Sequence, residues 1–465
     1  MIQTYLIDSD TRLKDAFLTG GSPRRVLRLA PSAIAAYQAI VQREQLTQTA
    51  RALAARLVRD GLIHPDPPST VVADLTIVIP VRDRATELDR CLRAVQKSTN
   101  SPIIVVDDGS IEPSKVAKVA MRHQVTLITL AANIGPAAAR NIGCGAASTS
   151  LVAFVDSDVV VQRGWLEGLL GHFADPVVAG VAPRIVGVRA VDTTVARLIA
   201  RRSPLDLGLR AGPVIAMSRL SYVPSAALVM RRECATFDPA LRYGEDVDLV
   251  WRLIAGGSQI RYEPRSVVHH LEPTTVRSWL RRRYHYGTSA APLDVRHPSH
   301  VRPVVLDPIA TAIALLLAIG RWRLAVGAYG LATGYTALRC RAVGLATNDA
   351  ATDTARSVAW AASMIATWLH QFVVPALPAA LLAAVRTPDR RRLSTVAAML
   401  VVPILVDRRL LRRRYPESAY VPADVLAMLL DRAAYGLGVF SGAIALRRPA
   451  VILPKILAIP RIKKR

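Results

Sequence analysis

Residues 151–161 have the sequence LVAFVDSDVVV, an apolar run that two acids interrupt. Its first part, 151–156, is short and rich in apolar and β-branched residues, which is typical of a buried strand. Asp156 and Asp158 are separated by one residue, and carboxylates this close repel each other unless a cation lies between them. Hard divalent ions prefer carboxylate oxygens and also bind phosphates. We therefore interpret Asp156 and Asp158 as ligands of Mn²⁺ or Mg²⁺, with a solvated turn as the alternative.

Three further runs of the same kind precede this strand. They are LTIVIPV (75–81), PIIVVDD (102–108) and VTLITL (125–130), and the amphipathic stretches 85–98 and 114–123 lie between them. This alternation predicts βαβ units and a mainly parallel sheet, with a ligand crevice at the carboxyl ends of the strands. The polar residues that follow each strand are therefore candidate site residues.

The ends of these strands carry acids, glycines and arginines. Acids at the end of a strand are placed to hydrogen-bond a base or ribose in the crevice. The glycines of NIGPAAARNIG (133–143) permit close approach of the backbone, and an arginine in that segment is spaced to reach a diphosphate. Ordinary turns are the alternative for both segments. The candidate binding residues are Pro80, Arg82, Asp107, Asp108, Asn133, Arg140 and Asp156.

A further acidic cluster lies in FDPALRYGEDVDLVWRL, residues 237–253. Glu245 and Asp246 precede a predicted helix and so lie near its positive end. A reaction that uses a hydroxyl nucleophile needs a base to take its proton, and we expect Asp246 to be that base, with Glu245 as a less favoured substitute. Capping of the helix by Asp246 is the alternative.

The segment RYEPRSVVHH (261–270) ends in two histidines, His269 and His270. Successive strand residues face opposite ways, so only one of the two can point into the crevice. Imidazole is a suitable ligand for Mn²⁺. The pattern leaves open which histidine is the ligand, and a hydrogen-bonded or exposed histidine is the ordinary alternative for each.

The flanking parts of the chain differ in composition. Residues 1–72 are polar and mixed; helices near 32–43 and 47–60 and a closing strand predict a winged-helix-like module. This module resembles the peptide-binding domain of enzymes that modify ribosomally made peptides, and a plain N-terminal packing domain is the alternative. Residues 301–465 are apolar and rich in arginine, and 357–385 is the run that is long enough to span a bilayer. A helical domain with solvated arginine faces is the alternative. We expect three parts: 1–72, a catalytic domain over 73–300, and a membrane-associated helical region over 301–465.

The whole chain carries 60 Lys and Arg against 35 Asp and Glu, a net charge of +25. Such an excess favours anionic partners, and without a recognisable nucleic-acid-binding motif we expect nucleotide phosphates and the inner face of a membrane rather than nucleic acid. The four cysteines show neither zinc-type spacing nor a disulfide framework, and the N-terminus lacks a signal peptide. We therefore expect a membrane location with the catalytic part in the cytoplasm.

The motifs IPVRDR, VVDDGS, NIGPAAARNIG, FVDSD, FDPALRYGEDVDLVWRL and VVHH occur in this order within residues 79–270. The ordered set resembles family 2 glycosyltransferases of the GT-A fold. The resemblance implies an α/β, Rossmann-like mixed sheet, a UDP-sugar donor, and a single displacement that inverts the anomeric carbon. The QxxRW motif of processive synthases is absent, which argues against long polymerisation. By resemblance, the uracil and ribose contacts are Asp107 and Asp108, the metal motif is Asp156 and Asp158 with one of His269 and His270, and the base is Asp246.

Three segments also resemble the glycosyltransferases of the mycofactocin system of actinobacteria. They are GGSPRRVLRLAP (20–31), RRRYHYGTSAAPL (281–293) and the apolar, arginine-rich last third. The resemblance implies transfer of β-linked glucose from UDP-glucose to a peptide-derived redox cofactor or its precursor. Two alternatives remain: a cell-envelope lipid or polysaccharide as the acceptor, and a non-catalytic sugar-binding scaffold, which would predict a missing acid in one of the motifs.

Overall fold

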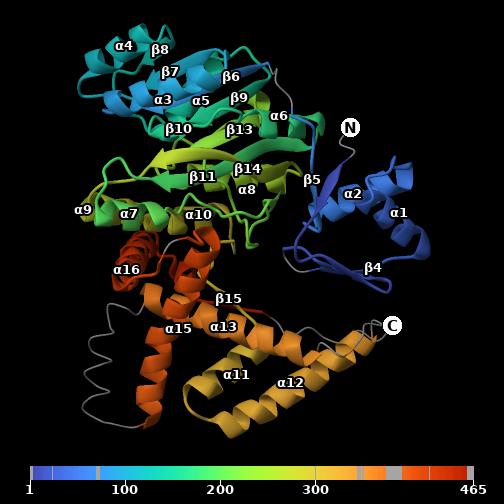
Figure 1. The fold of residues 1–465 in the computed structure, drawn as a ribbon. Coiled ribbons are helices and arrows are strands. Elements are labelled where there is room, and N and C mark those ends of the chain that lie inside the picture. Colours follow the sequence, from blue (N-terminus) through green and yellow to red (C-terminus); the bar gives the residue numbers. More distant parts are fainter. Residues whose placement is uncertain are drawn as a thin grey trace. The chain divides into compact units, whose positions relative to one another are not determined.

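The computed structural model describes residues 4–22, 25–69, 74–298, 300–342, 347, 350–372, 390–417 and 419–457. The chain divides into two compact units, Met1–Thr275 and Val276–Arg465, and each is described by itself (Figure 1). The division into three parts at residues 72 and 300 stays a prediction.

The first unit is built on a nine-stranded mixed sheet in the order β10-β14-β11-β13-β9-β6-β7-β8, with β12 paired to β14. Strands β6 to β9 are parallel neighbours, whereas β13 runs antiparallel to β9 and β11. The strands are β6 (Leu75–Val81), β7 (Ile103–Asp107), β8 (Thr126–Thr129), β9 (Leu151–Val155), β10 (Val159–Val161), β11 (Val178–Val188), β12 (Gly212–Pro213), β13 (Ala227–Arg231) and β14 (Gln259–Leu271). The fold is thus the α/β, GT-A type with a mixed sheet, as the sequence predicts.

Helices cover both faces of this sheet. On one face, α3 (Ala85–Ser98) and α4 (Pro113–Arg122) bury their apolar sides against alternate residues of β6, β7 and β9, as the amphipathic spacing requires. On the other face lies α5 (Pro136–Ala146), where a Cβ added at Gly143 would come within 2.4 Å of a Val78 methyl carbon. Glycine therefore allows α5 to pack closely on β6. The other α-helices within residues 74–275 are α6 (Glu167–Leu170), α7 (Thr194–Arg201) and α8 (Glu245–Ala255).

Strand β14 contains a bulge. Its pairing with β11 runs through Glu263, opposite Pro183, and resumes at Val267, opposite Arg184. Three residues of β14 are therefore left over at this point. A bulge of this kind re-aims the side chains of a strand, and here Arg265 donates from the bulge to Asp66 over 2.7 Å.

The beginning of the first unit forms an N-terminal module, residues 4–69. It contains α1 (Pro31–Val41) and α2 (Gln48–Arg59), close to the predicted helices. Strand β1 (Tyr5–Ile7) pairs with β5 (Ile63–Pro65). A three-stranded sheet of β2 (Arg12–Lys14), β3 (Phe17–Gly20) and β4 (Arg25–Arg28) was not predicted. The module has its own core, made of side chains such as Leu18, Ile40, Leu57 and Ile63.

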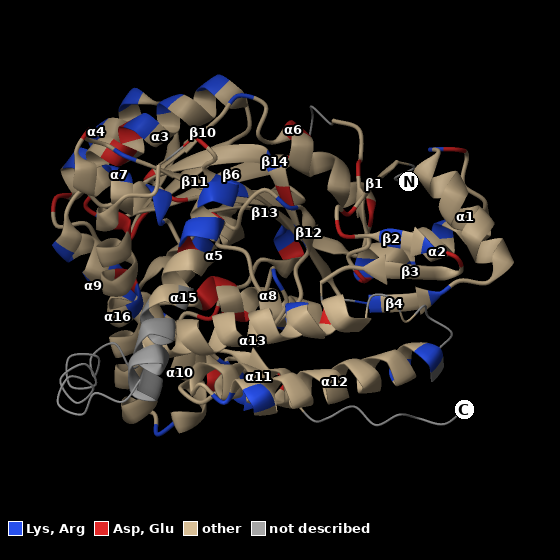
Figure 2. Cartoon of the chain, turned by 60° about the horizontal axis from the view of Figure 1, so that its bottom comes forward, with Lys and Arg blue, Asp and Glu red and all other residues tan. Residues whose placement is uncertain are grey.

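The second unit is mainly helical. In it, α9 (Val276–Thr288) and α16 (Pro422–Ala445) cross closely. A Cβ at Gly287 would come within 2.1 Å of the Tyr435 carbonyl oxygen, and one at Gly438 within 2.0 Å of the Tyr284 oxygen, so glycine at these positions allows the close contact. Figure 2 shows that α11 and α12 are largely uncharged. The elements are α9 (Val276–Thr288), α10 (Ala290–Arg296), β15 (Val305–Leu306), α11 (Pro308–Ala318), α12 (Trp322–Ala342), α13 (Ala350–Phe372), α15 (Arg390–Arg414), α16 (Pro422–Ala445) and β16 (Lys455–Ile456).

Among the described helices, α16 is the one whose length and apolar composition would suffice to cross a membrane, and 33% of its most apolar window is buried. One such helix is weak evidence, because core helices of globular proteins reach the same values. The predicted run 357–385 lies partly in α13, and its residues from 373 onward lie outside the described part of the chain.

Candidate active site

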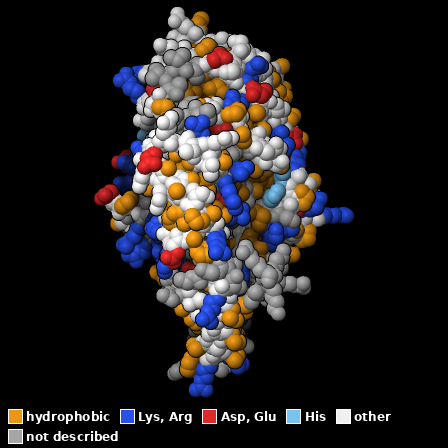
Figure 3. All heavy atoms as spheres, turned by 90° about the vertical axis from the view of Figure 1, so that its right-hand side faces the viewer, with side chains coloured by type: hydrophobic (Ala, Val, Ile, Leu, Met, Phe, Trp, Pro, Cys, Tyr) orange, Lys and Arg blue, Asp and Glu red, His pale blue; other side chains and the backbone are white. Residues whose placement is uncertain are grey.

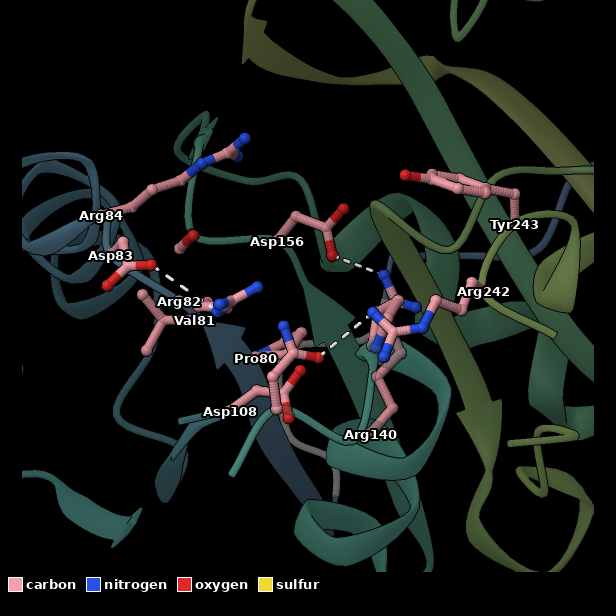
Figure 4. Close-up of a pocket in the computed structure, with 13 residues that line it drawn as sticks. Pro80, Val81, Arg82, Asp83, Arg84, Asp108, Arg140, Asp156, Arg242 and Tyr243 are labelled. Carbon is pink, nitrogen blue, oxygen red and sulfur yellow. Dashed lines mark hydrogen bonds and ion pairs between the residues drawn. The ribbon is translucent and has the colours of Figure 1, made fainter. Parts of the chain in front are cut away.

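A cavity of about 440 Å³ lies at the carboxyl ends of β6, β7 and β9 (Figure 4). This is the edge of the sheet at which the sequence analysis places the ligand crevice. We call it the donor cavity. It is lined by Pro80, Val81, Arg82, Asp83, Arg84, Asp108, Asn133, Pro136, Arg140, Asp156, Ser157, Arg242 and Tyr243.

Hydrogen bonds connect two turns that line the donor cavity. The Asp108 carboxylate accepts hydrogen bonds from the backbone N–H groups of Ile134, at 2.8 Å, and Gly135, at 3.0 Å. Gly109 has a φ of +64°, and a Cβ there would lie 2.5 Å from the carbonyl carbon of Ala132. Only glycine allows this contact. The DDGS turn and the NIG segment therefore form one rigid wall.

Asp107 lies beneath this wall and is fully buried. Its Oδ1 accepts from the backbone N–H of Ser110 at 3.0 Å and from the Ser110 hydroxyl at 2.5 Å. Its Oδ2 has no hydrogen-bond partner among the residues that the structure describes. A buried oxygen of this kind calls for an explanation, and a donor group of a bound molecule is one.

Arg140 joins three elements at the cavity. From α5 its guanidinium donates to Asp156 at the end of β9, over 2.7 Å, and to Glu245 at the start of α8, over 2.9 Å. The Arg140 side chain is only 4% exposed, and its guanidinium carbon lies 5.5 Å from the centre of the Phe237 ring. Figure 4 shows the Arg140 and Asp156 side chains facing each other across the cavity. Acids far apart in the sequence are thereby brought to one place.

Glu245 and Asp246 form a coupled acidic pair beside Arg140. Burial, and then the charge of Asp246, raise the pKa of Glu245 to about 7. Burial also raises the pKa of Asp246, against the opposing charge of Arg140. Asp246 Oδ2 accepts from the backbone N–H of Ser225 at 3.3 Å, and its Oδ1 accepts from that of Val247 at 2.8 Å. Glu245 can therefore take up a proton near neutral pH, and Asp246 takes one up above the usual pH range of an aspartate.

The two histidines of β14 face opposite ways. The Nε2 of His270 lies 3.4 Å from Asp158 Oδ1, and its Nδ1 lies 3.1 Å from Glu272 Oε1. His269 instead pairs with Gln162 at 3.1 Å. The structure therefore brings His270, and not His269, to Asp158. The other oxygen of Asp158 is paired with Arg84.

The chain resembles known proteins over most of its length. A sequence profile described as "Glycosyl transferase family 2" matches residues 76–233. The "Pre-mycofactocin glycosyltransferase" of Mycobacterium tuberculosis is 40% identical over 458 residues, which cover 94% of each chain. The chain therefore belongs to glycosyltransferase family 2.

This glycosyltransferase has more distant relatives as well. The "Succinoglycan biosynthesis protein ExoO" of Rhizobium meliloti is 29% identical over 45% of this chain and 64% of that protein. A solved "Mannosyltransferase PcManGT from Pyrobaculum calidifontis in complex with GDP-Man and Mn2+" shares 18% identity, covering 76% of this chain and 90% of that one, with a TM-score of 0.39.

The predicted metal ligands of the glycosyltransferase are only partly brought together. Within residues that the structure describes, no group of three or more His, Cys, Asp or Glu side chains is placed to hold a metal ion. Asp158 and His270 are close, and Asp156 lines the donor cavity. Carboxylate and imidazole ligands suit Mn²⁺. The donor set therefore fits a divalent ion that takes further ligands from a diphosphate and water.

Seven residues of the donor cavity were not predicted as site residues: Val81, Asp83, Arg84, Pro136, Ser157, Arg242 and Tyr243. Asp83 Oδ1 accepts from the Ile111 N–H at 2.6 Å and so fixes the turn after β6. Asp83 and Arg84 belong to the motif IPVRDR, the same motif as the predicted site residues Pro80 and Arg82. Arg242 and Tyr243 lie three and two residues before Glu245, and their position at the cavity follows only from the three-dimensional structure.

Proposed function

We propose that this glycosyltransferase transfers glucose from UDP-glucose, with inversion to a β linkage, onto pre-mycofactocin, a peptide-derived redox cofactor precursor. The observation that carries the chemistry is the pairing of both Asp156 and Glu245 with Arg140 beside the donor cavity, with Asp246 next to Glu245 in α8. The acceptor rests on the 40% identity with the pre-mycofactocin glycosyltransferase over 94% of the chain.

The donor cavity offers groups for each part of a UDP-sugar. Its 440 Å³ is within the usual range for small-molecule sites. Asp108 directly follows β7 and lines the cavity, where it suits ribose hydroxyls. Asp107, the last residue of β7, lies outside the lining of the cavity and is fully buried, and its unpartnered Oδ2 suits an N–H of uracil that reaches it. Arg82 and Arg84 line the cavity and bring positive charge for the diphosphate.

Mn²⁺ or Mg²⁺ would be held by Asp156, Asp158 and His270. When bound, such an ion neutralises charge that develops on the departing nucleotide diphosphate. Among the described residues, the pairing of His269 with Gln162 argues for His270 as the imidazole ligand.

Asp246 acts as the base. Its carboxylate is fixed by two backbone N–H groups, whereas that of Glu245 is bound in the ion pair with Arg140. In the reaction, Asp246 takes the proton of the acceptor hydroxyl while that oxygen attacks the anomeric carbon. The bond from this carbon to the diphosphate breaks on the opposite side, so the configuration inverts. The ion pair with Arg140 prevents the Glu245 carboxylate from acting as the base.

Two matched variants test the base. Asp246→Asn should bind UDP as the wild type does and lose about 10²-fold or more in turnover, because only the proton acceptor is removed. Glu245→Gln should lose less. Turnover by Asp246→Asn near the wild-type rate, together with a large loss in Glu245→Gln, would move the base to Glu245.

The function itself is tested with the purified full-length protein, several nucleotide sugars and synthetic pre-mycofactocin, with product masses as the readout. We expect addition of hexose from UDP-glucose. Transfer only to a lipid or polysaccharide acceptor would support the envelope alternative instead.

We also propose that α11 and α12 contact the cytoplasmic face of the membrane. Several of their apolar side chains are strongly exposed, among them Trp322 at 61%, Leu324 at 57% and Leu331 at 79%. Arg321 and Arg323 lie beside them in the sequence, in a position to meet anionic headgroups.

A further inference from the structure

A second cavity, of about 680 Å³, lies where the N-terminal module meets the catalytic sheet. We call it the junction cavity. Residues of α2, β1 and β5 form one side of it, and the starts of β11 and β14 with β12 form the other. It is lined by Tyr5, Arg51, Ala55, Val58, Arg59, Pro65, Ala174, Asp175, Pro176, Val177, Pro213, Val214, Ile215, Ile254, Gly257, Ser258, Gln259, Ile260 and Arg261.

The junction cavity is separate from the donor cavity. Arg261 lies near the beginning of β14 and His270 near its end. The two positions are nine residues apart, which corresponds to roughly 30 Å in a regular strand and to less across the bulge. No lining residue is shared between the two cavities. A molecule in the junction cavity therefore does not occupy the donor site.

Ion pairs hold the two sides of the junction cavity in place. Asp8 of the N-terminal module accepts from Arg210 of the catalytic part at 2.8 Å and from His64 at 2.9 Å. On another side, Asp66 pairs with Arg265 at 2.7 Å. Asp8 is 6% exposed, so its pairing is a buried one. The walls are thus fixed by specific contacts between the two parts of the first unit.

The junction cavity contains a buried cation with spare donors. Arg261 is 5% exposed, and its Nη2 donates to Asp175 at 2.6 Å and to Gln259 at 3.1 Å. Its Nε and Nη1 have no hydrogen-bond partner in the described part of the chain. Leaving such donors buried and unsatisfied is costly, so an acceptor from a bound molecule would compensate for it.

The rest of the lining is apolar with a cationic rim. Val58, Val177, Ile215, Ile254 and Ile260 contribute aliphatic surface. Arg51 and Arg59 add two cations from α2, whereas Asp175 is the acid in the lining and already accepts from Arg261. Figure 3 shows hydrophobic side chains among Lys and Arg on the face that carries the N-terminal module. The charge and the surface together suit an anion with an apolar body.

We propose that the junction cavity is a second binding site, which takes a carboxylate joined to an apolar body, with Arg261 as the partner of the carboxylate. A planar guanidinium is well matched to a carboxylate. Such a ligand has two sources, the free C-terminus of an apolar peptide and a free apolar carboxylic acid. The proposal is independent of the sugar, the acceptor and the base proposed above.

Calorimetric titration of the full-length protein tests this site with three probes: an N-acetylated apolar tripeptide with a free carboxylate, its C-terminal amide, and octanoate. The carboxylate tripeptide should bind at least about tenfold more tightly than the amide, because a hydrogen bond to a charged group contributes about 1.5–3 kcal/mol. Octanoate that binds as tightly as the tripeptide identifies a free acid as the source. Octanoate that binds much more weakly identifies a peptide terminus.

Two variants change residues on opposite sides of the junction cavity. Arg261→Met should remove the preference for carboxylate over amide, and Ala55→Trp should fill the cavity from α2 and abolish binding of all probes. Arg232→Met, an arginine outside the cavity whose Nε donates to the Thr149 carbonyl, is the matched control and should bind as the wild type does. UDP binding should be unchanged in all three, which shows that each variant folds.

Three results would overturn the proposal: no binding of either carboxylate probe at millimolar concentration, an unchanged preference in Arg261→Met, or unchanged binding in Ala55→Trp. If Arg261→Met fails to bind UDP and so fails to fold, the Ala55→Trp result decides. Because UDP binding is measured separately, a failure of the donor-site proposal is distinguishable from a failure here.

Discussion

Replacing Arg140 by methionine should destabilise the first unit by about 3 kcal/mol at pH 8. Removal of one partner from a buried ion pair costs about 3–5 kcal/mol, since a charge is left buried without a counter-ion. Here the Glu245 side chain is 10% exposed and at pH 8 must stay charged without its counter-ion or take up a proton, whereas that of Asp156 is 29% exposed and keeps part of its hydration. The lower end of the range therefore applies.

The same penalty should shrink at lower pH. Burial and the charge of Asp246 already raise the pKa of Glu245 to about 7. Without Arg140 this pKa rises further, so at pH 5.5 the carboxyl is neutral and no buried charge remains to be compensated. We expect the difference between variant and wild type to fall to about half of its value at pH 8.

Differential scanning calorimetry of the full-length protein measures this effect. The transition that UDP shifts upward identifies the unit with the donor cavity, and it should fall by about 6–9 °C in Arg140→Met at pH 8. Adding Glu245→Gln should recover part of the loss. Arg122→Met is the control, because the Arg122 side chain is 64% exposed and its pair with Asp89 is worth at most about 1 kcal/mol. A shift in Arg140→Met no larger than in this control would refute the reasoning.

Three further predictions concern pH, metal and membrane. Turnover should fall as the pH drops into the acid range, because the base Asp246, whose pKa burial raises, takes up a proton. The stability contribution of Glu245 has the opposite sign: it grows as pH falls from 7 towards 4.5, so a parallel loss of activity and Tm would contradict this assignment. EDTA should abolish transfer and added Mn²⁺ or Mg²⁺ should restore it; full activity in chelator would disprove the metal proposal. Trp322→Ser should weaken co-sedimentation with phosphatidylglycerol vesicles severalfold, and equal binding by variant and wild type would count against α12 as the contact.

The catalytic sheet could be predicted because its signals are local. Strand β6 and helix α3 have the bounds that the periodicity predicts, since both bury one regular set of apolar side chains. The sheet of β2, β3 and β4 escaped prediction, because its strands have only three or four residues, and β2 and β4 also carry arginine or lysine. Short, charged strands have little apolar alternation to detect.

The candidate site was predicted in its residue types but not in its pairings. Arg140 was expected to reach towards a diphosphate, yet the structure pairs it with Asp156 and with Glu245, which is 105 residues away. A contact at that separation leaves no trace in local spacing. Strand alternation likewise predicted that one histidine of the pair faces the crevice, and the pairing of β10 with β14 was needed to identify it as His270.

The three surplus residues of β14, between Glu263 and Val267, uncouple the two ends of that strand. Beyond the bulge, the register of β14 with β11 starts again at Val267. Inserting or deleting a residue within the bulge therefore need not change the face of the strand to which each histidine points. A one-residue slip beyond Val267 would turn every later side chain to the opposite face. A slip in the direction that moves His269 into the place of His270 would keep an imidazole beside Asp158, whereas a slip in the other direction would bring Leu271 there.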